Sequence, residues 1–202
     1  MVDYSIENEY REKGFNIICG VDEAGRGPLA GPVYAAAVIL PSDCVIEGLN
    51  DSKKLTEKKR EALFDEIKDK ALAYGIASAD EKEIDEINIL NATFLAMKRA
   101  INSLSVKPDL ALIDGNQKPH TDIEEVTVIK GDAKSMSIAA ASVLAKVSRD
   151  RFMLEMAEKY PQYEFARHKG YGTKLHYEKI AQYGVCDIHR RTFLKKILGE
   201  QK

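Results

Sequence analysis

The stretch Ile17-Ile18-Cys19-Gly20-Val21-Asp22-Glu23-Ala24-Gly25-Arg26-Gly27 joins a short apolar run to two carboxylates and a Gly-Arg-Gly turn. The run up to Val21 is uncharged and rich in β-branched residues, which predicts a buried strand. Asp22 at the end of such a strand is costly to bury unless a cation or hydrogen bonds compensate its charge. The glycines on either side of Arg26 allow backbone amides to approach a sugar or a phosphate closely. The stretch therefore predicts a metal site beside a loop that suits nucleic-acid chemistry.

Further apolar runs have the length and composition of strands, and they span residues 33–40, 73–78, 109–113 and 126–129. Apolar residues at helical spacing predict helices over 56–70, from 80 to about 104 with a break near 88–91, over 135–160 and over 175–183. The loop after the first run is short enough for the first two strands to pair antiparallel. Three early strands followed by alternating strands and helices predict an α/β domain with a mixed sheet.

The composition is that of one globular domain. With 202 residues the chain can bury a large core. No apolar run approaches the length of a membrane span, and the polar residues 1–13 lack the apolar core of a signal peptide. The three cysteines have no paired-ligand spacing. Their number and spacing favour a reducing cytoplasm and argue against a zinc site.

The charge is balanced overall but segregated along the chain. A formal net charge of -2 does not favour a general polyanion binder, because such affinity depends on many Lys and Arg contacts to phosphate. Residues 80–86 are acid-rich, whereas basic residues gather toward the C-terminus: Arg167, His168, Lys169, Lys174, His189, Arg190, Arg191, Lys195 and Lys196. This segregation predicts a local basic groove. His168, His176 and His189 either contact phosphate there or lie on the surface, and the surface is the simpler interpretation.

Three acids stand where an apolar run meets a glycine-containing turn, namely Asp22, Asp114 and Asp132. Open α/β sheets build their sites at such strand ends. With Glu23 they make four carboxylates that can converge from distant parts of the chain. Carboxylates within about 4–6 Å of one another resist joint ionisation unless divalent cations neutralise them. Hard oxygen ligands favour Mg²⁺ or Mn²⁺, and two such ions would stabilise the attacking and leaving oxygens of a phosphodiester.

Each acid also has a purely local interpretation. Asp22 can cap a turn with a solvated Glu23 beside it, and Asp114 belongs to a common Asp-Gly turn dipeptide. Asp132 can be an acid that favours a helix N-terminus. Ser142 is more simply a small packing residue than a nucleophile. The sequence contains no Walker-type phosphate loop and no G-x-S-x-G elbow that would offer a competing mechanism.

The motifs taken together resemble those of the ribonuclease HII family, in order, from about residue 16 to residue 193. They are Val21-Asp22-Glu23-Ala24-Gly25-Arg26-Gly27, Asn50-Asp51-Ser52-Lys53-Lys54-Leu55, Ile113-Asp114-Gly115, Lys130-Gly131-Asp132, Ser137-Ile138-Ala139-Ala140-Ala141-Ser142, His168-Lys169-Gly170-Tyr171-Gly172-Thr173 and His189-Arg190-Arg191-Thr192-Phe193. The resemblance implies a ribonuclease H-like fold: a five-stranded mixed sheet flanked by helices, with a helical C-terminal segment. It also implies an N-terminal extension over 1–15 and a type 2 ribonuclease H domain over 16–202.

The resemblance implies an activity and its catalytic groups. Enzymes of this family hydrolyse the RNA strand of RNA–DNA hybrids and cut at ribonucleotides embedded in duplex DNA, leaving 3′-hydroxyl and 5′-phosphate ends. By the same resemblance, Asp22, Glu23, Asp114 and Asp132 would be catalytic, metal-binding carboxylates. They would hold one Mn²⁺ or Mg²⁺ without substrate and two with it. Asp132 is expected to join only when substrate brings the second ion.

The resemblance also implies the substrate contacts. Gly25, Arg26 and Gly27 would recognise the ribose 2′-hydroxyl, which distinguishes RNA from DNA at a given site. Tyr171 would pack on the adjoining deoxyribose. Lys53 and Lys169 would contact phosphates, which position a substrate without specifying it.

The expected partners are RNA–DNA hybrids and duplex DNA containing ribonucleotides, bound by a cytoplasmic monomer with no membrane association. Some relatives end in a sliding-clamp-binding tail with paired aromatics, and residues 194–202 contain no such motif.

Three alternatives remain open at the level of sequence. The related ribonuclease HIII is the nearest, but it usually carries an extra N-terminal domain and departs from Gly-Arg-Gly. A non-catalytic hybrid-binding module could use the acids to hold one structural cation. A phosphatase for small phosphate esters is the third, since two-metal sites serve those reactions as well. Metal-dependent turnover would exclude the binding module, and a steep loss of affinity with salt would favour a polymer substrate.

Overall fold

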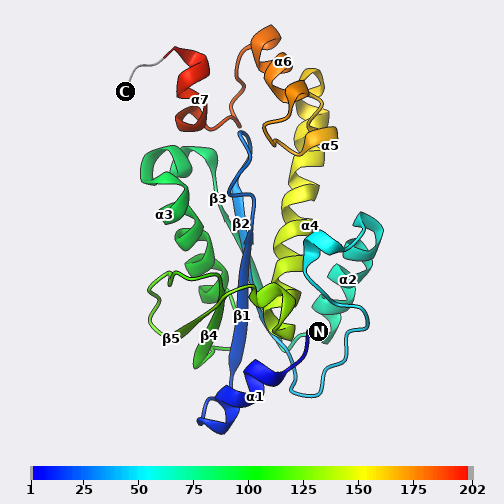
Figure 1. Ribbon diagram of the computed structural model, residues 1–202, viewed down its shortest axis with the longest axis vertical. Helices are drawn as coiled ribbons and strands as arrows, with labels where there is room; N and C mark the ends of the chain where they lie inside the picture. The colour runs from blue at the N-terminus through cyan, green and yellow to red at the C-terminus, as the bar shows by residue number, and fades with distance from the viewer. Residues whose placement is uncertain (1, 200–202) are drawn as a thin grey trace.

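The computed structural model describes residues 2–199, so the last residues of the C-terminal stretch, 200–202, lie outside it. A five-stranded sheet forms the centre of the molecule (Figure 1). Its strands, in the spatial order β3-β2-β1-β4-β5, are β3 (Ala73–Ala79), β2 (Val33–Ile39), β1 (Ile18–Ala24), β4 (Leu110–Asp114) and β5 (Glu124–Val128). β1, β2 and β3 pair antiparallel, whereas β1, β4 and β5 pair parallel. The mixed sheet predicted from the sequence is therefore confirmed.

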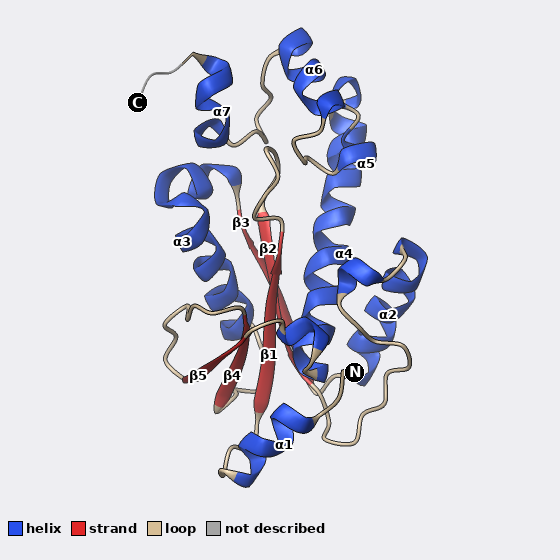
Figure 2. Ribbon diagram, viewed as in Figure 1, coloured by secondary structure: helices blue, strands red, loops and turns tan. Residues whose placement is uncertain are grey.

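Helices cover both faces of this sheet (Figure 2). One face carries α3 (Glu81–Asn102), and the other carries α4 (Met136–Lys159) with α2 (Glu57–Lys70) packed beside it. The helix α1 (Ser5–Glu12) lies at one end of the molecule, and the short helices α5 (Phe165–His168), α6 (Lys174–Tyr183) and α7 (Arg191–Leu198) gather at the other. No helix within residues 2–199 is long and apolar enough to cross a membrane.

The two faces of the sheet form two separate hydrophobic clusters, as strand alternation requires. Ala36 and Val38 of β2 pack toward α2 and α4, whereas Ala35 and Ala37 pack toward α3. The sheet and α4 approach each other closely. A Cβ on Gly20 of β1 would lie 2.1 Å from the backbone of α4, so only glycine fits there. This close contact brings the start of α4 against β1, and the loop before α4 carries Asp132.

The starts of the three long helices have the side-chain caps that their sequences predict. Thr56 and Ser135 each accept a hydrogen bond from a backbone N–H of the first turn, of α2 and α4 respectively. Asp80 forms a reciprocal capping box with Glu83 at the start of α3. Asn88 has φ of 65° inside α3, which confirms the predicted break.

The terminal segments are more helical than their sequences predict. The sequence pattern indicated one short helix after Pro161, and the structure has α5, α6 and α7 there. α5 is a single turn and α7 two turns, lengths at which helices depend on tertiary packing rather than on propensity. At the other terminus, α1 is anchored by Glu7, whose fully buried carboxylate accepts hydrogen bonds from the Ser135 hydroxyl and the Ser137 N–H. The N-terminal residues therefore contact the start of α4.

Candidate active site

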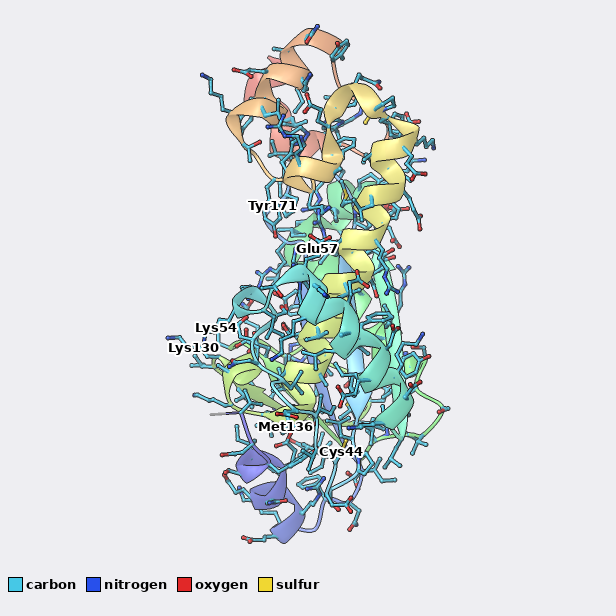
Figure 3. The ribbon with its side chains drawn as sticks, turned by 90° about the vertical axis from the view of Figure 1, so that its right-hand side faces the viewer. Cys44, Lys54, Glu57, Lys130, Met136 and Tyr171 are labelled. Carbon is cyan, nitrogen blue, oxygen red and sulfur yellow. The ribbon has the colours of Figure 1, made fainter. Side chains whose placement is uncertain are left out.

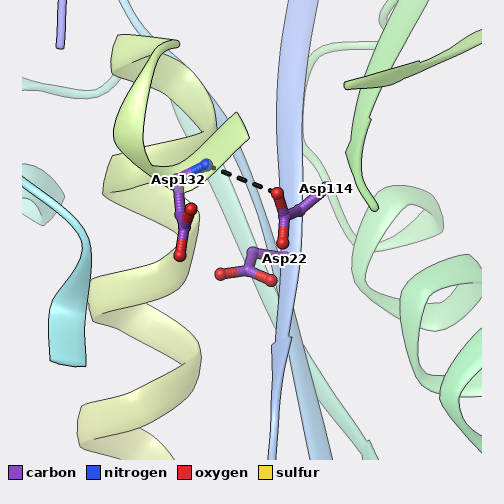
Figure 4. Close-up of side chains that lie close together, drawn as sticks. All are labelled: Asp22, Asp114 and Asp132. Atoms are coloured by element: carbon purple, nitrogen blue, oxygen red, sulfur yellow. Dashed lines mark hydrogen bonds between the residues drawn. The ribbon is translucent and has the colours of Figure 1, made fainter. Parts of the chain in front are cut away.

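Three of the four predicted acids converge beside the central strands (Figure 4). β1 and β4 are parallel neighbours with Val21 opposite Ile113, so Asp22 and Asp114 follow at equivalent positions. Asp132 comes from a short 3-10 turn, η2 (Gly131–Ala133), that precedes α4. Asp22, Asp114 and Asp132 each offer one carboxylate oxygen, and these oxygens all lie within 4.8 Å of one another.

Backbone hydrogen bonds connect η2 to the strand end. The Asp114 Oδ1 atom accepts the Gly131 N–H at 2.6 Å. It also accepts the Asp132 N–H at 3.4 Å, which is the bond drawn in Figure 4. The Glu23 N–H in turn donates to Asp22 Oδ1 at 2.7 Å. Two of the three carboxylates are thus oriented by backbone donors, which leaves their other oxygens available to a ligand.

Glu23 stands apart from this group of three, because consecutive strand residues point to opposite faces. Its Oε1 atom lies 3.5 Å from Arg26 Nη1, and it lines a small cavity of about 30 Å³ with Arg26 and Asp114. Glu23 therefore lies beside Asp114 in this cavity, outside the group that Asp114 forms with Asp22 and Asp132. Asp132, expected from the resemblance to join only with substrate, already lies in the group of three.

The raised pKa values of the acids show that this group of carboxylates favours a positive charge beside it. Burial raises the pKa of Asp22 well above its usual value, and the nearby carboxylates of Glu23 and Asp114 raise it further. Burial likewise raises the pKa of Glu23 and of Asp132, and Asp114 adds to both shifts. Lys53 Nζ lies 3.6 Å from Asp132 Oδ2, but its side chain is exposed. A hard divalent cation fits this donor set of carboxylate oxygens.

Two neighbouring polar residues, to which the sequence analysis gave no role in the site, support the acids. The buried hydroxyls of Ser52 and Ser142 lie 2.8 Å apart, which joins the Ser52–Lys54 turn to α4. The Ser142 side chain also lowers the pKa of Asp22, against the burial that raises it. Ser142 is therefore a polar neighbour of the site and not only a packing residue. Its position in α4, seven residues after the cap Ser135, places it on the same helical face, and that spacing is the signal that could have identified it.

The Gly-Arg-Gly loop follows β1 and is held by the C-terminal segment. The Leu29 N–H donates to the Gly170 carbonyl and the Gly31 N–H to the Ile188 carbonyl, each at 2.8 Å. Gly25 has φ of 97°, a conformation that favours glycine. The loop surface around Gly27 is open, since a Cβ there would meet nothing within 4 Å. The backbone of this loop is thus rigid and accessible.

The predicted substrate-contacting residues Tyr171 and Lys169 have different surroundings. The Tyr171 ring is 43% exposed at the narrow part of the molecule, and the Arg149 guanidinium lies 5.7 Å from its centroid (Figure 3). In the same view Lys54 and Lys130 stand on the side of the molecule that carries Tyr171. Lys169 Nζ donates to the Ala166 carbonyl at 3.0 Å. The ammonium of Lys169 is therefore engaged within its own segment.

The three C-terminal histidines are buried, so their predicted surface location is wrong. His176 Nε2 lies 3.1 Å from His189 Nε2, and the ring of His168 stacks on that of His176 at 4.3 Å between centroids. Burial lowers the pKa of His176 and of His189 to about 4. These rings supply both packing area and hydrogen bonds to the core of the C-terminal segment. Arg190 is buried as well, so the basic groove predicted from this segment lacks several of its expected members.

Known proteins share both the sequence pattern and the fold. A sequence profile of the ribonuclease HII family matches residues 19–196. A ribonuclease HII from Caldicellulosiruptor bescii is 58% identical over 196 residues, which are 97% of this chain and 95% of that protein. The chain belongs to the ribonuclease HII family. Membership makes it an endoribonuclease that acts on RNA–DNA hybrids, and the non-catalytic alternative is excluded.

Solved structures agree with the ribonuclease HII assignment. The crystal structure of the ribonuclease H2 from Pyrococcus horikoshii has a TM-score of 0.76 at 30% identity, with 92% of this chain and 97% of that chain covered. The crystal structure of Bst-RNase HIII in complex with Mn²⁺ has a TM-score of 0.66 at 18% identity, covering 83% of this chain and 63% of that chain. The latter likeness shows the shared fold only. The predicted ribonuclease H-like fold is thereby confirmed, and the ribonuclease HIII alternative is not.

Proposed function

We propose that this ribonuclease HII incises duplex DNA at single embedded ribonucleotides as well as cleaving RNA–DNA hybrids, and that it leaves 3′-hydroxyl and 5′-phosphate ends by two-metal-ion hydrolysis. The observation that carries the proposal is that the carboxylates and the Gly-Arg-Gly loop lie next to each other at the end of β1. Three strand-end and turn carboxylates converge on one side of β1, and β1 leads within three residues of Asp22 into the open Gly25–Gly27 loop. Hydrolysis and ribose recognition would thus share one rigid segment.

The carboxylates have defined parts in this mechanism. Asp22, Asp114 and Asp132 would hold one ion through carboxylate oxygens, and Glu23, which lies beside Asp114, would add a donor when substrate brings a second ion. Mg²⁺ or Mn²⁺ held there would activate water and stabilise the leaving 3′ oxygen. The backbone N–H groups that contact Asp114 and Asp22 hold those side chains in place, so the geometry is set before substrate arrives. The donor set, which consists of carboxylate oxygens, supports this choice of ion.

The loop and Tyr171 would select the substrate. Gly25, Arg26 and Gly27 would contact the 2′-hydroxyl, and the half-exposed ring of Tyr171 would stack on the adjoining deoxyribose. Lys53, whose ammonium lies near Asp132, suits a contact with the phosphate next to the bond that breaks. Lys169 would contact a more distant phosphate after leaving the Ala166 carbonyl. Such contacts need one copy of the chain, and we propose a monomer.

The cellular setting is part of the proposal. Cys19, Cys44 and Cys186 are all free thiols, as expected in a reducing cytoplasm. The domain of residues 16–202 would act there on duplex DNA and hybrids, with residues 1–15 as an extension.

A cleavage assay tests this function. The substrates are a DNA duplex with one ribonucleotide, the same duplex without it, and a uniform hybrid, each in Mg²⁺ and in Mn²⁺. We expect incision of the first and third substrates only, with 5′-phosphate ends identified by end labelling. The matched control is Asp22→Asn, which keeps the side-chain shape. A folded wild-type preparation that leaves the single-ribonucleotide duplex intact in both metals would contradict the proposal.

A further inference from the structure

Two arginines are fully buried in the region that joins the Gly-Arg-Gly loop to the C-terminal segment. Arg149 belongs to α4, and Arg190 directly precedes α7. Within residues 2–199, neither guanidinium has a carboxylate oxygen within 4.0 Å. Buried charges are usually paired with an opposite charge. Here backbone carbonyl groups satisfy both of them, so their arrangement fixes backbone rather than neutralising an acid.

Arg190 holds the Gly-Arg-Gly loop through three carbonyls. Its Nη2 atom donates to the Gly25 carbonyl at 2.6 Å, Nη1 to the Arg26 carbonyl at 3.0 Å and Nε to the Gly31 carbonyl at 2.8 Å. A planar guanidinium presents its donors in a fixed fork, so one side chain sets the orientation of three peptide groups together. The loop backbone is therefore oriented from its buried side by a residue 159 to 165 positions away in sequence.

The orientation of the carbonyls decides where the loop amides point. The C=O and N–H of a trans peptide point in opposite directions, and this chain has no cis peptide. Because the Gly25 and Arg26 carbonyls point inward to Arg190, the N–H groups of Arg26 and Gly27 point away from it. Neither amide donates to another group in the described part of the chain. Two adjacent free donors are thus presented on the open side of the loop.

Arg149 connects the same loop to Tyr171. Its side chain donates to the carbonyls of Ala30, Pro32 and Lys169 at 3.1 to 3.2 Å. Its guanidinium also lies 5.7 Å from the Tyr171 ring centroid. It packs so closely on Gly25 that a Cβ there would lie 2.1 Å from Arg149 Nε. The two arginines together fix the loop against the segment that carries the aromatic ring.

We propose that Arg190 is a positioning residue for ribose recognition: by fixing the Gly25 and Arg26 carbonyls it aims the Arg26 and Gly27 amides at the 2′-hydroxyl of the substrate. Arg149 sets the spacing between these amides and Tyr171. The inference rests on the proposed function of the loop, because Arg190 acts through the loop and touches no substrate. Arg190 was expected in a basic groove on the surface, and the inference gives it a role in substrate specificity instead of a contact with phosphate.

The test compares Arg190→Lys and Arg190→Met with Arg151→Met. Arg151 is a matched control, because it lies in the same molecule on α4 in an exposed ion pair with Glu61, away from the loop. A lysine keeps the charge but offers no fork for three carbonyls, so both Arg190 variants should lose on the order of 100-fold in kcat on the single-ribonucleotide duplex. Affinity for the all-DNA duplex should stay within about threefold, since phosphate contacts give non-specific binding.

Hydrogen–deuterium exchange supplies a readout that does not depend on activity. In Arg190→Lys, the hydrogen-bonded amides of Leu29 and Gly31 should exchange at least about tenfold faster, while those of β1, β4 and α3 stay protected. Addition of guanidinium at low millimolar concentration should restore part of the kcat of an Arg190→Gly variant.

Several outcomes would overturn the inference. Wild-type kcat in Arg190→Lys would do so, and so would faster exchange over the whole chain together with equal losses on every substrate, which indicates a role in folding alone. Failure of the proposed function is a separate result, in which the wild type leaves the single-ribonucleotide duplex intact. In that case the comparison of amide exchange between wild type and Arg190→Lys would still show whether Arg190 fixes the loop.

Discussion

A buried carboxylate such as Asp22 affects stability and activity in opposite directions. Its pKa in the folded chain is raised by burial first and by Glu23 and Asp114 next. Between the unfolded and the folded pKa, the unfolded chain has lost its proton while the folded chain keeps it. The free energy of unfolding therefore falls as pH rises through this window. The acid that metal chemistry requires is, without metal, a source of instability at neutral pH.

Asp22→Asn should therefore stabilise the metal-free protein while it abolishes cleavage. The amide carries no charge to bury, so we expect a higher Tm than wild type at about pH 7 and little gain at about pH 3, where the acid is mostly protonated in both states. Thermal unfolding in EDTA at the two pH values measures this difference. An equal or lower Tm at neutral pH would show that another interaction compensates Asp22.

Two glycines of the same loop should respond differently to alanine. At Gly25 a Cβ would collide with Arg149 and φ is 97°, so Gly25→Ala should cost about 1–3 kcal/mol of stability. At Gly27 the space is open, so Gly27→Ala should leave the Tm nearly unchanged and reduce cleavage by crowding the substrate side. Chemical denaturation and the single-ribonucleotide assay separate the two effects. Equal stability losses would contradict the different surroundings of the two residues.

At the scale of elements, α1 and the start of α4 form one unit. The Glu7 carboxylate is fully buried, and it receives the Ser135 hydroxyl and the Ser137 N–H. A carboxylate at a helix N-terminus is favoured by the helix dipole and by free N–H groups. The turn that carries Asp132 immediately precedes these serines. A helix at the N-terminus of the chain thus supports an active-site turn from behind.

Removal of this contact should weaken both the fold and the site. Glu7→Ala should lower the free energy of unfolding by about 1–3 kcal/mol, because buried donors lose their acceptor. Glu9→Ala on the same helix is the control, since Glu9 is exposed and, among the residues that the structure describes, pairs with Lys13 alone. Its effect should stay within about 0.5 kcal/mol. Urea unfolding of both variants measures the difference. A Glu9 effect as large as that of Glu7 would indicate that α1 contributes only general packing.

At the scale of the whole molecule, the candidate metal site joins three separate parts of the chain: β1, β4 and the turn before α4. A ligand that binds only the folded state stabilises it by mass action. Added Mn²⁺ should therefore raise the Tm of the wild type, with a gain of about 2.7 kcal/mol at 100 times Kd. Asp114→Asn, which removes a central donor, should lose most of that gain. A metal-induced shift of equal size in this variant would place the ion elsewhere.

The sequence by itself determined the strands, the long helices and the identity of the acids. Apolar periodicity, glycine turns and caps such as Thr56 and Ser135 are local signals, so they can be recognised without the fold. The order of motifs determined the family. Three acids at run ends next to glycines, with Glu23 beside one of them, also indicated metal chemistry, because no other local role unites them.

The tertiary structure alone decided which of these residues meet. Parallel pairing of β1 with β4 aligned Asp22 with Asp114, and close packing of α4 on Gly20 brought Asp132 to them, whereas strand alternation turned Glu23 aside. Burial also could not be derived from residue type: basic Arg190 and the histidines, predicted on the surface, lie inside because carbonyls and rings satisfy them there. Side-chain roles depend on contacts between distant segments, and sequence spacing does not encode those contacts.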